Sequence, residues 1–309
     1  MYPKTHSALD LNQRIQDLYD RSSSLWEDTW GEHMHHGYYD LGESSSESSS
    51  ESSGKSTSES SRTKTRYQAQ VDLIEQLITW SGVRQTPPTK ILDLGCGIGG
   101  SSLYLANLFP QAQITGITLS PVQANRAKIR ASAHNLSDRV QFLVADALAM
   151  PFNPQSFDLV WSLESGEHMP DKQKFIQACD RVLTPSGRLI VATWCHRPTN
   201  DRPLTTYEQR HLERIYAAYC LPHVISLPEY AEIMSTLNYQ NLQVADWSTA
   251  VAPFWDLVIS SFLTPNTFWR VLNSGLVTLN AAMSLRLMSR GYASGLVRFG
   301  LLTGLKPAP

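Results

Sequence analysis

One stretch of the chain decides its fold: Lys90-Ile91-Leu92-Asp93-Leu94-Gly95-Cys96-Gly97-Ile98-Gly99-Gly100-Ser101. It begins as a short apolar run, breaks into a glycine-rich turn and continues into a helical pattern of apolar residues. This order predicts a β-strand, a tight loop and the N-terminus of a helix. Because glycine has no Cβ atom, the backbone N–H groups of such a loop can lie against a ligand.

The loop fits two kinds of cofactor site, which the neighbouring residues separate. Gly95, Gly97 and Gly100 match the G-x-G-x-x-G pattern of dinucleotide-binding proteins. Asp93, however, would repel a pyrophosphate, and the next strand ends at Thr118 without the acid that binds a nucleotide ribose. S-adenosylmethionine carries an ammonium and a sulfonium group and no phosphate, so the sequence favours this methyl donor. The residues of the loop expected to contact it are Asp93, Gly95, Cys96, Gly97 and Gly99.

Composition limits the function further. The chain has 309 residues, of which 42% are hydrophobic, enough for one large domain with a cap. Its net charge of -2 gives no electrostatic case for binding nucleic acid. The four cysteines lack C-x-x-C spacing and indicate reduced thiols. We see no signal or transit peptide and no apolar run long enough for a transmembrane helix. We therefore expect a cytoplasmic protein, either free or peripheral to a membrane.

Strand and helix patterns alternate after the glycine loop. Ser120 and Gln123 form a capping box with Pro121 between them, and Asp171 is placed to cap a later helix. Besides the apolar run before Gly95, strands are expected at residues 113–118, 140–145, 157–162, 188–194, 242–247 and 296–305. The alternation predicts an α/β fold with a mostly parallel sheet and helices on both faces.

The chain divides into four regions. Residues 1–42 contain a helical pattern and then His33, His35 and His36 among aromatic residues. A metal site would need a fourth ligand that the sequence does not show, so we expect no metal. The alternatives are simple packing and a lid over the active site, with Tyr19, Tyr38 or a histidine contacting the donor or the substrate. Residues 43–64 are serine-rich and predict a disordered linker. Residues 65–196 predict the donor-binding core, and 197–309 a helical insertion on the substrate side with the final strands.

Polar residues follow the carboxyl ends of the predicted strands, where α/β proteins bind ligands. Thr118 and Leu119 follow the second strand, and Gln123 begins the helix beside the donor pocket. Asp146 and Ala147 follow the third strand, where an acid can accept a hydrogen bond from the adenine amino group. We expect all five to contact the donor.

Two carboxylates and a histidine crowd the loop after the fourth strand. Glu164, Glu167 and His168 lie within five residues of one another there. The loop could be polar for structural reasons alone, held by its own hydrogen bonds. It faces the same crevice as the glycine loop, however, and this favours a catalytic role.

Six stretches resemble a known family. They are residues 31–39 (with His-Met-His-His-Gly), 93–102, 117–123, 161–171 (with Glu-Ser-Gly-Glu-His-Met-Pro-Asp), 193–197 and 245–255. Together they resemble the γ-tocopherol C-methyltransferases of photosynthetic organisms, within the class I methyltransferases that use S-adenosylmethionine. The resemblance implies a Rossmann-like sheet of seven strands with a helical cap. It also implies methylation of the aromatic ring of a prenylated chromanol (γ- to α-tocopherol and δ- to β-tocopherol), a step of vitamin E biosynthesis.

Such chemistry needs a general base, because an aromatic carbon is a poor nucleophile until the phenol loses its proton. His168 is the expected base, with Glu164 and Glu167 as orienting groups or substitutes and the histidines of residues 33–36 as a rival source. The prenyl tail of the substrate would lie against aromatic side chains of the C-terminal insertion. The residues expected to contact the substrate are His35, His36, Trp194, Phe254 and Trp255.

Three other functions stay open at this point. Related plant enzymes with the same motifs methylate alkaloid nitrogen atoms. Residues 118–123 also resemble cyclopropane synthases that act on lipids, although the balanced charge gives little support for binding anionic lipid. A donor-binding protein without catalysis is the third alternative, and the acid-and-histidine loop argues against it.

Overall fold

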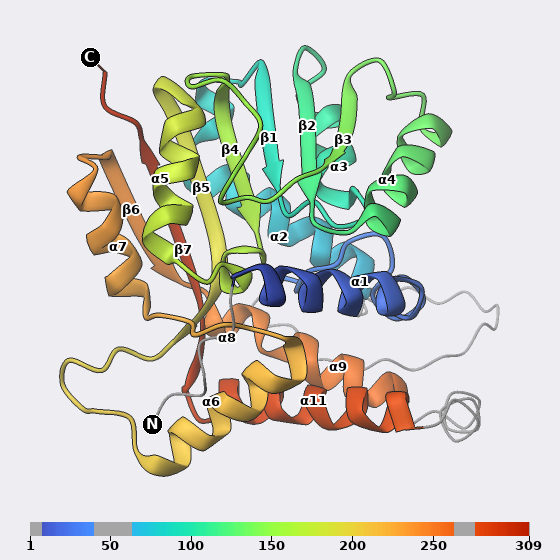
Figure 1. Ribbon diagram of the computed structural model, residues 1–309, viewed down its shortest axis with the longest axis vertical. Coiled ribbons are helices and arrows are strands. Elements are labelled where there is room, and N and C mark those ends of the chain that lie inside the picture. The colour runs from blue at the N-terminus through green and yellow to red at the C-terminus, as the bar shows by residue number, and fades with distance from the viewer. Residues whose placement is uncertain (1–7, 40–63, 263–275, 309) are drawn as a thin grey trace, which may run out of the picture.

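The computed structural model describes residues 8–39, 64–262 and 276–308. Within this part of the chain, seven strands form one sheet in the order β3-β2-β1-β4-β5-β7-β6 (Figure 1). The strands are β1 (Lys90–Leu94), β2 (Gln113–Thr118), β3 (Val140–Val144), β4 (Phe157–Leu163), β5 (Leu183–His196), β6 (Gln240–Asp246) and β7 (Val297–Leu305). The predicted seven-strand α/β fold is therefore confirmed. Nearly all of the predicted serine-rich linker lies outside the described residues.

All strands of the sheet run in the same direction except β7. β1 to β5 pair in parallel, and β7 runs antiparallel to both β5 and β6. Strand order reverses direction between β1 and β4, which is where a doubly wound sheet opens a crevice at the carboxyl ends of its strands. Asp93 lies at this point, opposite Gly116 of β2 and Trp161 of β4.

One strand begins earlier than predicted. The turn residues 184–187 suggested that β5 starts at residue 188, but Leu183 already pairs with Phe157. The register shifts between Phe157 and Leu159, and Ser186 has a φ of 61°. In an irregular ladder of this kind, turn-forming residues can lie inside a paired strand. The sequence pattern therefore predicts a turn followed by a strand where the structure has one continuous strand.

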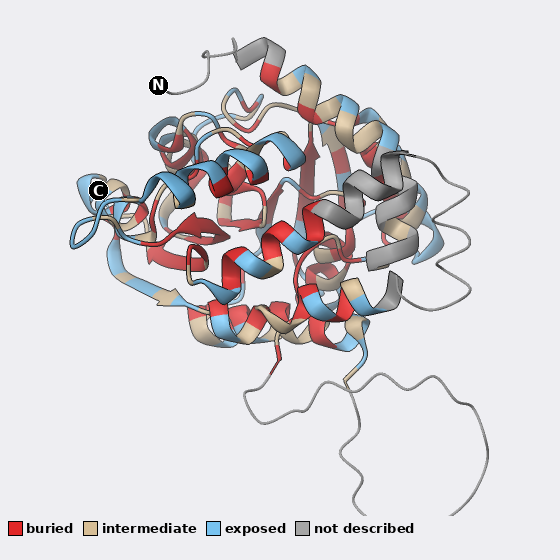
Figure 2. Ribbon diagram, turned by 90° about the horizontal axis from the view of Figure 1, so that it is seen from below, coloured by how far each residue is buried: buried red, intermediate tan, exposed pale blue. Residues whose placement is uncertain are grey.

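Both faces of the sheet are buried by helices. Ile91 and Ile190 belong to one apolar core, and their neighbours Leu92 and Leu189 belong to the other. The first core is formed with α2 (Arg66–Ser81), α3 (Gly100–Leu108) and α4 (Pro121–Ala133). The second is formed with α5 (Lys172–Val182) and α7 (Leu227–Thr236). Figure 2 shows the buried strands inside and the exposed outer faces of the surrounding helices.

A helical cap lies beyond one end of the sheet (Figure 1). It contains α6 (Thr206–Tyr219), α8 (Ser248–Val251), α9 (Pro253–Phe262) and α11 (Leu276–Ala293). α1 (Ala8–Trp30) runs across this end of the sheet, where its Glu27 pairs with Arg126 and Arg130 of α4. None of the helices in the described ranges is both long and apolar enough to span a bilayer.

Candidate active site

The loop between β1 and α3 needs glycine at two positions. Gly95 has a φ of 79° and Gly97 a φ of 53°, a left-handed conformation that other residues rarely adopt. The N–H groups of Gly95 and Cys96 both donate to the carbonyl of Ile117 at 2.9 Å, which fixes the loop against β2. A Cβ atom on Gly95 would lie 2.3 Å from the Cβ atom of Ser165. The loop is therefore held tightly between two neighbouring strands.

Asp93 is buried at the base of this loop. Its side chain is 2% exposed and accepts a hydrogen bond of 2.5 Å from the Ser102 hydroxyl. Burial raises the pKa of Asp93 to about 7, although the hydrogen bond from Ser102 acts in the opposite direction. The carboxyl group thus titrates near neutral pH, and a cation bound beside it would favour its ionised form.

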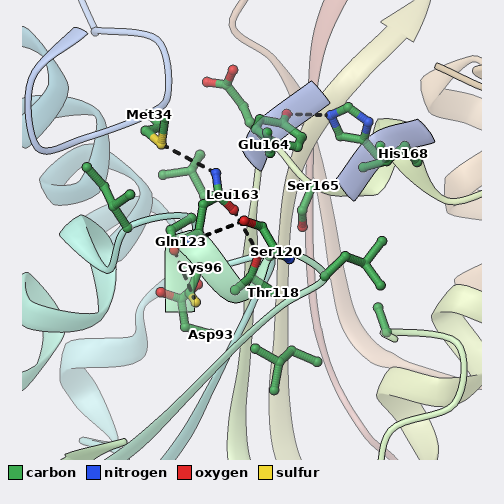
Figure 3. A pocket seen from close by; sticks show the side chains of 18 of the residues that line it. Met34, Asp93, Cys96, Thr118, Ser120, Gln123, Leu163, Glu164, Ser165 and His168 are labelled. Carbon is green, nitrogen blue, oxygen red and sulfur yellow. Dashed lines mark hydrogen bonds between the residues drawn. The ribbon is translucent and has the colours of Figure 1, made fainter. Parts of the chain in front are cut away.

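A pocket with an empty volume of about 990 Å³ lies above the loop. It is lined by most of the predicted donor contacts: Tyr19, Asp93, Gly95, Cys96, Gly97, Thr118, Leu119, Gln123, Asp146 and Ala147. Figure 3 shows Met34, Glu164 and His168 at the end of the pocket away from Asp93. Asn12, Ile15 and Ser165 also line this pocket, although they were not predicted to contact the donor. We refer to it as the donor pocket.

The carboxyl ends of β2 and β3 form one wall of the donor pocket. The Thr118 hydroxyl donates to Oε1 of Gln123 at 2.8 Å, and the backbone N–H of Gln123 donates to the Ser120 hydroxyl at 3.0 Å. The predicted capping box is only half present, because Ser120 caps the helix while the Gln123 side chain bonds to Thr118 and not back to Ser120. Asp146 accepts a hydrogen bond of 2.8 Å from the Asn12 side chain of α1. No local sequence signal indicates Asn12, because its partner lies 134 positions away.

A second, smaller pocket adjoins the first. It has an empty volume of about 500 Å³ and is lined by Leu18, Tyr19, Met34, Glu164, Glu167, His168, Trp194 and Tyr219. Four of these residues, Tyr19, Met34, Glu164 and His168, line the donor pocket as well. We call this second cavity the acceptor pocket, because a molecule in it would meet the donor at the four shared residues.

Glu164 lies at the junction of the two pockets and is held from three sides. Its Oε1 accepts from the backbone N–H of His36 at 2.6 Å. Its Oε2 accepts from Nδ1 of His36 at 2.7 Å and from Nε1 of Trp194 at 3.1 Å. The backbone of Glu164 has a φ of 52°, which is rare for a residue with a side chain and typical of functional sites.

His168 contacts α1. Its Nε2 atom lies 2.9 Å from the Tyr19 hydroxyl, so the expected base already has a hydrogen-bond partner from the N-terminal region. Burial, together with the charge of Lys172, lowers the pKa of His168 to about 3. A free imidazole titrates near neutral pH, and the burial of this ring removes that advantage from the expected base. His168 is neutral at ordinary assay pH.

Glu167 is also buried, but on the inner side of the loop. It accepts a hydrogen bond of 2.8 Å from the Thr193 hydroxyl, and burial and the nearby Glu164 raise its pKa to about 8. It is therefore protonated at neutral pH and does not contact His168 as an ionised orienting group. Lys172 donates to the carbonyls of Gly166, Glu167 and Met169 at 3.0, 2.9 and 2.6 Å, which anchors the loop.

Several predicted contacts lie outside the two pockets. Tyr38 packs on Trp247, with ring centroids 5.2 Å apart. Gly99 precedes α3 as its N-cap and has no space for a Cβ atom beside Phe142. Neither lines the donor pocket. His36, Phe254 and Trp255, predicted to touch the substrate, are instead fully buried together behind Glu164. The sequence alone does not show whether histidines and aromatic residues in such a pattern contact a ligand or pack against one another.

His35 lines the donor pocket and not the acceptor pocket. Its Nδ1 atom lies 2.8 Å from the carbonyl of His36, which can only accept, so Nδ1 carries the proton and Nε2 is an acceptor. This Nε2 atom is buried and has no hydrogen-bond partner among the described residues. Burial lowers the pKa of His35 well below its usual value, so the ring stays neutral. Across the described residues, no group of three or more metal-ligating side chains is arranged to hold a metal ion.

The donor pocket suits S-adenosylmethionine. Four carboxyl groups line it, those of Glu32, Asp93, Asp146 and Glu164, while its described lining contains no lysine or arginine. A cationic ligand without phosphate matches this set of charges, and the unpartnered acceptor on His35 can receive one of its N–H or O–H groups. The apolar side chains of Ile98, Leu119 and Met169 provide surface for a purine ring.

Comparisons with known proteins agree with this geometry. A model of the methyltransferase domain matches residues 92–191. A probable chloroplastic tocopherol O-methyltransferase of Oryza sativa subsp. japonica is 45% identical over 96% of this chain and 79% of its own length. The 2-methyl-6-phytyl-1,4-hydroquinone methyltransferase of Synechocystis sp. is 30% identical over 99% of this chain and 92% of its own length.

The fold also matches solved structures. The geranyl diphosphate C-methyltransferase of Streptomyces coelicolor A3(2) superposes with a TM-score of 0.73 at 21% identity, covering 97% of this chain and 99% of that one. At this identity the match supports the architecture alone. The relatives of higher identity extend over almost the whole chain, beyond the glycine loop that many methyltransferases share. The chain therefore belongs to the tocopherol methyltransferase family of class I, S-adenosylmethionine-dependent methyltransferases.

Proposed function

We propose that the protein methylates the aromatic ring of a prenylated chromanol, at the carbon ortho to the phenol hydroxyl. γ-Tocopherol would yield α-tocopherol, and δ-tocopherol would yield β-tocopherol. One observation supports this most: the donor pocket meets the acceptor pocket at Tyr19, Met34, Glu164 and His168. The acceptor pocket has an aromatic and apolar side formed by Trp194, Tyr219 and Leu18, which suits an aromatic ring.

The loop of residues 164–168 would supply the group that takes the phenol proton. The donor contributes an activated methyl group on sulfur, so the protein has to align the acceptor, exclude water and remove this proton. A free phenol has a pKa of about 10 and is mostly protonated at neutral pH. Two ionisable side chains of the loop line both pockets and can accept it, namely Glu164 and His168.

The acceptor's prenyl tail partitions into lipid, so we propose that the protein meets its acceptor at a membrane surface. We also propose that it works in the cytoplasm, as the sequence predicts, although the rice relative is named as chloroplastic. Sedimentation with vesicles, with and without γ-tocopherol in the bilayer, tests the first proposal. Fractionation of the cells that make the protein tests the second.

A product assay tests the reaction. The protein is incubated with methyl-labelled S-adenosylmethionine and separate chromanols, prenylated hydroquinones, fatty acyl lipids and amines, and each product is identified by NMR. We expect a new aryl methyl group ortho to a free hydroxyl. A methoxy product would assign oxygen methylation, as the name of the rice relative states for that protein. A product from only amines or lipids would refute the proposal.

A further inference from the structure

Glu164 has one hydrogen-bond acceptor position left. An ionised carboxylate offers about four lone-pair positions, two on each oxygen. The Nδ1–H of His36 and the Nε1–H of Trp194 fill both positions on Oε2, and the backbone N–H of His36 fills one on Oε1. No other donor among the described residues reaches Glu164, so one position on Oε1 is available to a ligand at the junction of the two pockets.

The donor and acceptor in this contact follow if Glu164 is ionised, the form in which it can accept a proton. An ionised carboxylate can only accept, so Nδ1 of His36 must carry a proton and donate it. The side chains of His36 and Glu164 are 0% and 3% exposed, so water competes little for the bond. His36 also donates through its backbone, and two bonds from one residue fix the carboxylate in both direction and rotation.

His36 itself cannot reach a ligand. It lines neither pocket, and five aromatic rings surround its imidazole at centroid distances from 4.9 to 5.9 Å. These rings belong to Trp194, Phe254, Trp255, Tyr292 and Phe299. They lock the imidazole in place, so any effect of His36 on the reaction must pass through Glu164.

We propose that His36 is a positioning residue that aims the open lone pair of Glu164 at the acceptor's phenol hydroxyl, and that Glu164 is the proton acceptor. This inference rests on the proposed function. Glu164 takes the hydroxyl proton while the ortho carbon bonds to the methyl group and the methyl–sulfur bond breaks. The ortho carbon then releases its own proton to solvent, the ring regains aromaticity, and Glu164 returns its proton to the phenolic oxygen.

The other candidates on the loop are less suited. Nε2 of His168 is engaged with Tyr19, and this ring resists protonation because it is buried. Glu167 is bonded to Thr193 and already holds a proton at neutral pH. His168 shares the contact with both pockets and has an unpartnered Nδ1 atom, but its low pKa disfavours proton uptake. Glu164 combines an open lone pair, contact with both pockets and an orientation fixed by two bonds from His36.

Two nearly isosteric substitutions test the role of His36. His36→Asn and His36→Leu remove the same ring from the aromatic cluster, but only asparagine keeps an N–H donor near the place of Nδ1. The free energy of a hydrogen bond to a charged group corresponds to a factor of about 10 to 100 in rate. We therefore expect the kcat of His36→Leu to fall by about this factor. His36→Asn should recover about tenfold of it, while the KM for the acceptor and the Kd for the donor change little.

Stability separates positioning from packing. In an apolar cluster the His36→Leu protein should be at least as stable as the His36→Asn protein. His36→Leu should therefore have the higher melting temperature and the lower kcat of the two variants. If His36 only fills space, His36→Leu will match or exceed His36→Asn in both measurements, which overturns the inference. The same pair of substitutions at exposed His134, which lies at the end of α4, is the control and should leave kcat unchanged.

Glu164→Gln completes the test. It should reduce kcat by about 10²–10⁴ while donor affinity persists. If Glu164→Gln stays within a few-fold of the wild type, Glu164 is not the proton acceptor and the inference fails. Failure of the proposed function looks different, because the wild-type protein would then transfer no methyl group to any chromanol.

Discussion

Donor affinity should depend on pH through Asp93. The pKa of this buried carboxyl is raised to about 7 in the free protein, so about nine-tenths of the molecules carry it protonated at pH 6. A cationic donor binds better beside the ionised form. The sign follows directly: donor affinity should increase as pH rises through 7 and decrease as pH falls below it.

The magnitude follows from the same pKa. If only the ionised form binds, the Kd for the donor at pH 6 is about tenfold weaker than its limit at high pH, and about 100-fold weaker at pH 5. Binding at pH 6 should also release about 0.9 proton per donor, and almost none at pH 8. Calorimetry in two buffers with different ionisation enthalpies measures both the affinity and the proton release.

Two variants assign the effect to Asp93. Asp93→Asn should bind the donor more weakly and lose the pH dependence between pH 5 and 7. Ser102→Ala removes the hydrogen bond that holds this pKa down, so the midpoint should move to higher pH. Burial lowers the pKa of Lys172 to about 7 and raises the pKa of Glu167 to about 8, so both groups titrate in a similar range. If the pH dependence survives in Asp93→Asn, one of those groups is responsible and our reasoning is refuted.

Four further outcomes are expected. His168→Ala should keep kcat within about tenfold of the wild type, and a 10²-fold loss in a product assay would return the proton-accepting role to this histidine. Lys172→Met leaves three carbonyls without their donor and should cost about 3 kcal/mol in denaturant unfolding; a loss below 1 kcal/mol would contradict the anchoring role. Tyr219→Ala should raise the acceptor KM and leave the donor Kd unchanged, which initial rates and calorimetry separate. Gly95→Ala should lose more stability than Gly82→Ala, because both have positive φ but only the first meets a neighbour within 3 Å.

The sheet and the donor loop were predictable because they are local in sequence. A strand buried on both faces is a short apolar run, and the glycine loop needs positive φ at fixed positions within five residues. The residues of the loop therefore carry their own structural signal. The same holds for Gln123, whose place in the donor pocket follows from the helix that Ser120 caps.

The roles of the histidines could not be predicted in this way. His36 was expected to contact the substrate, and His168 was expected to be the general base. In the structure His36 is buried behind Glu164, and His168 is paired with Tyr19. Both outcomes depend on contacts between residues 128 and 149 positions apart. An imidazole can serve as a base, a donor or a packed ring, and only its distant neighbours decide which.

The contacts of α1 differ in kind from those of the loop that it covers. Several contacts of α1 with the core are polar and lie at the rim, such as Asn12 to Asp146 and Glu27 to Arg126, and partly exposed pairs of this type stabilise weakly. Buried Leu11 and Ile15 and the bond between Tyr19 and His168 add to them. The loop of residues 164–168 is instead fixed by buried bonds from Lys172 and His36. The groups expected to do the chemistry therefore belong to the loop whose polar contacts are the more fully buried.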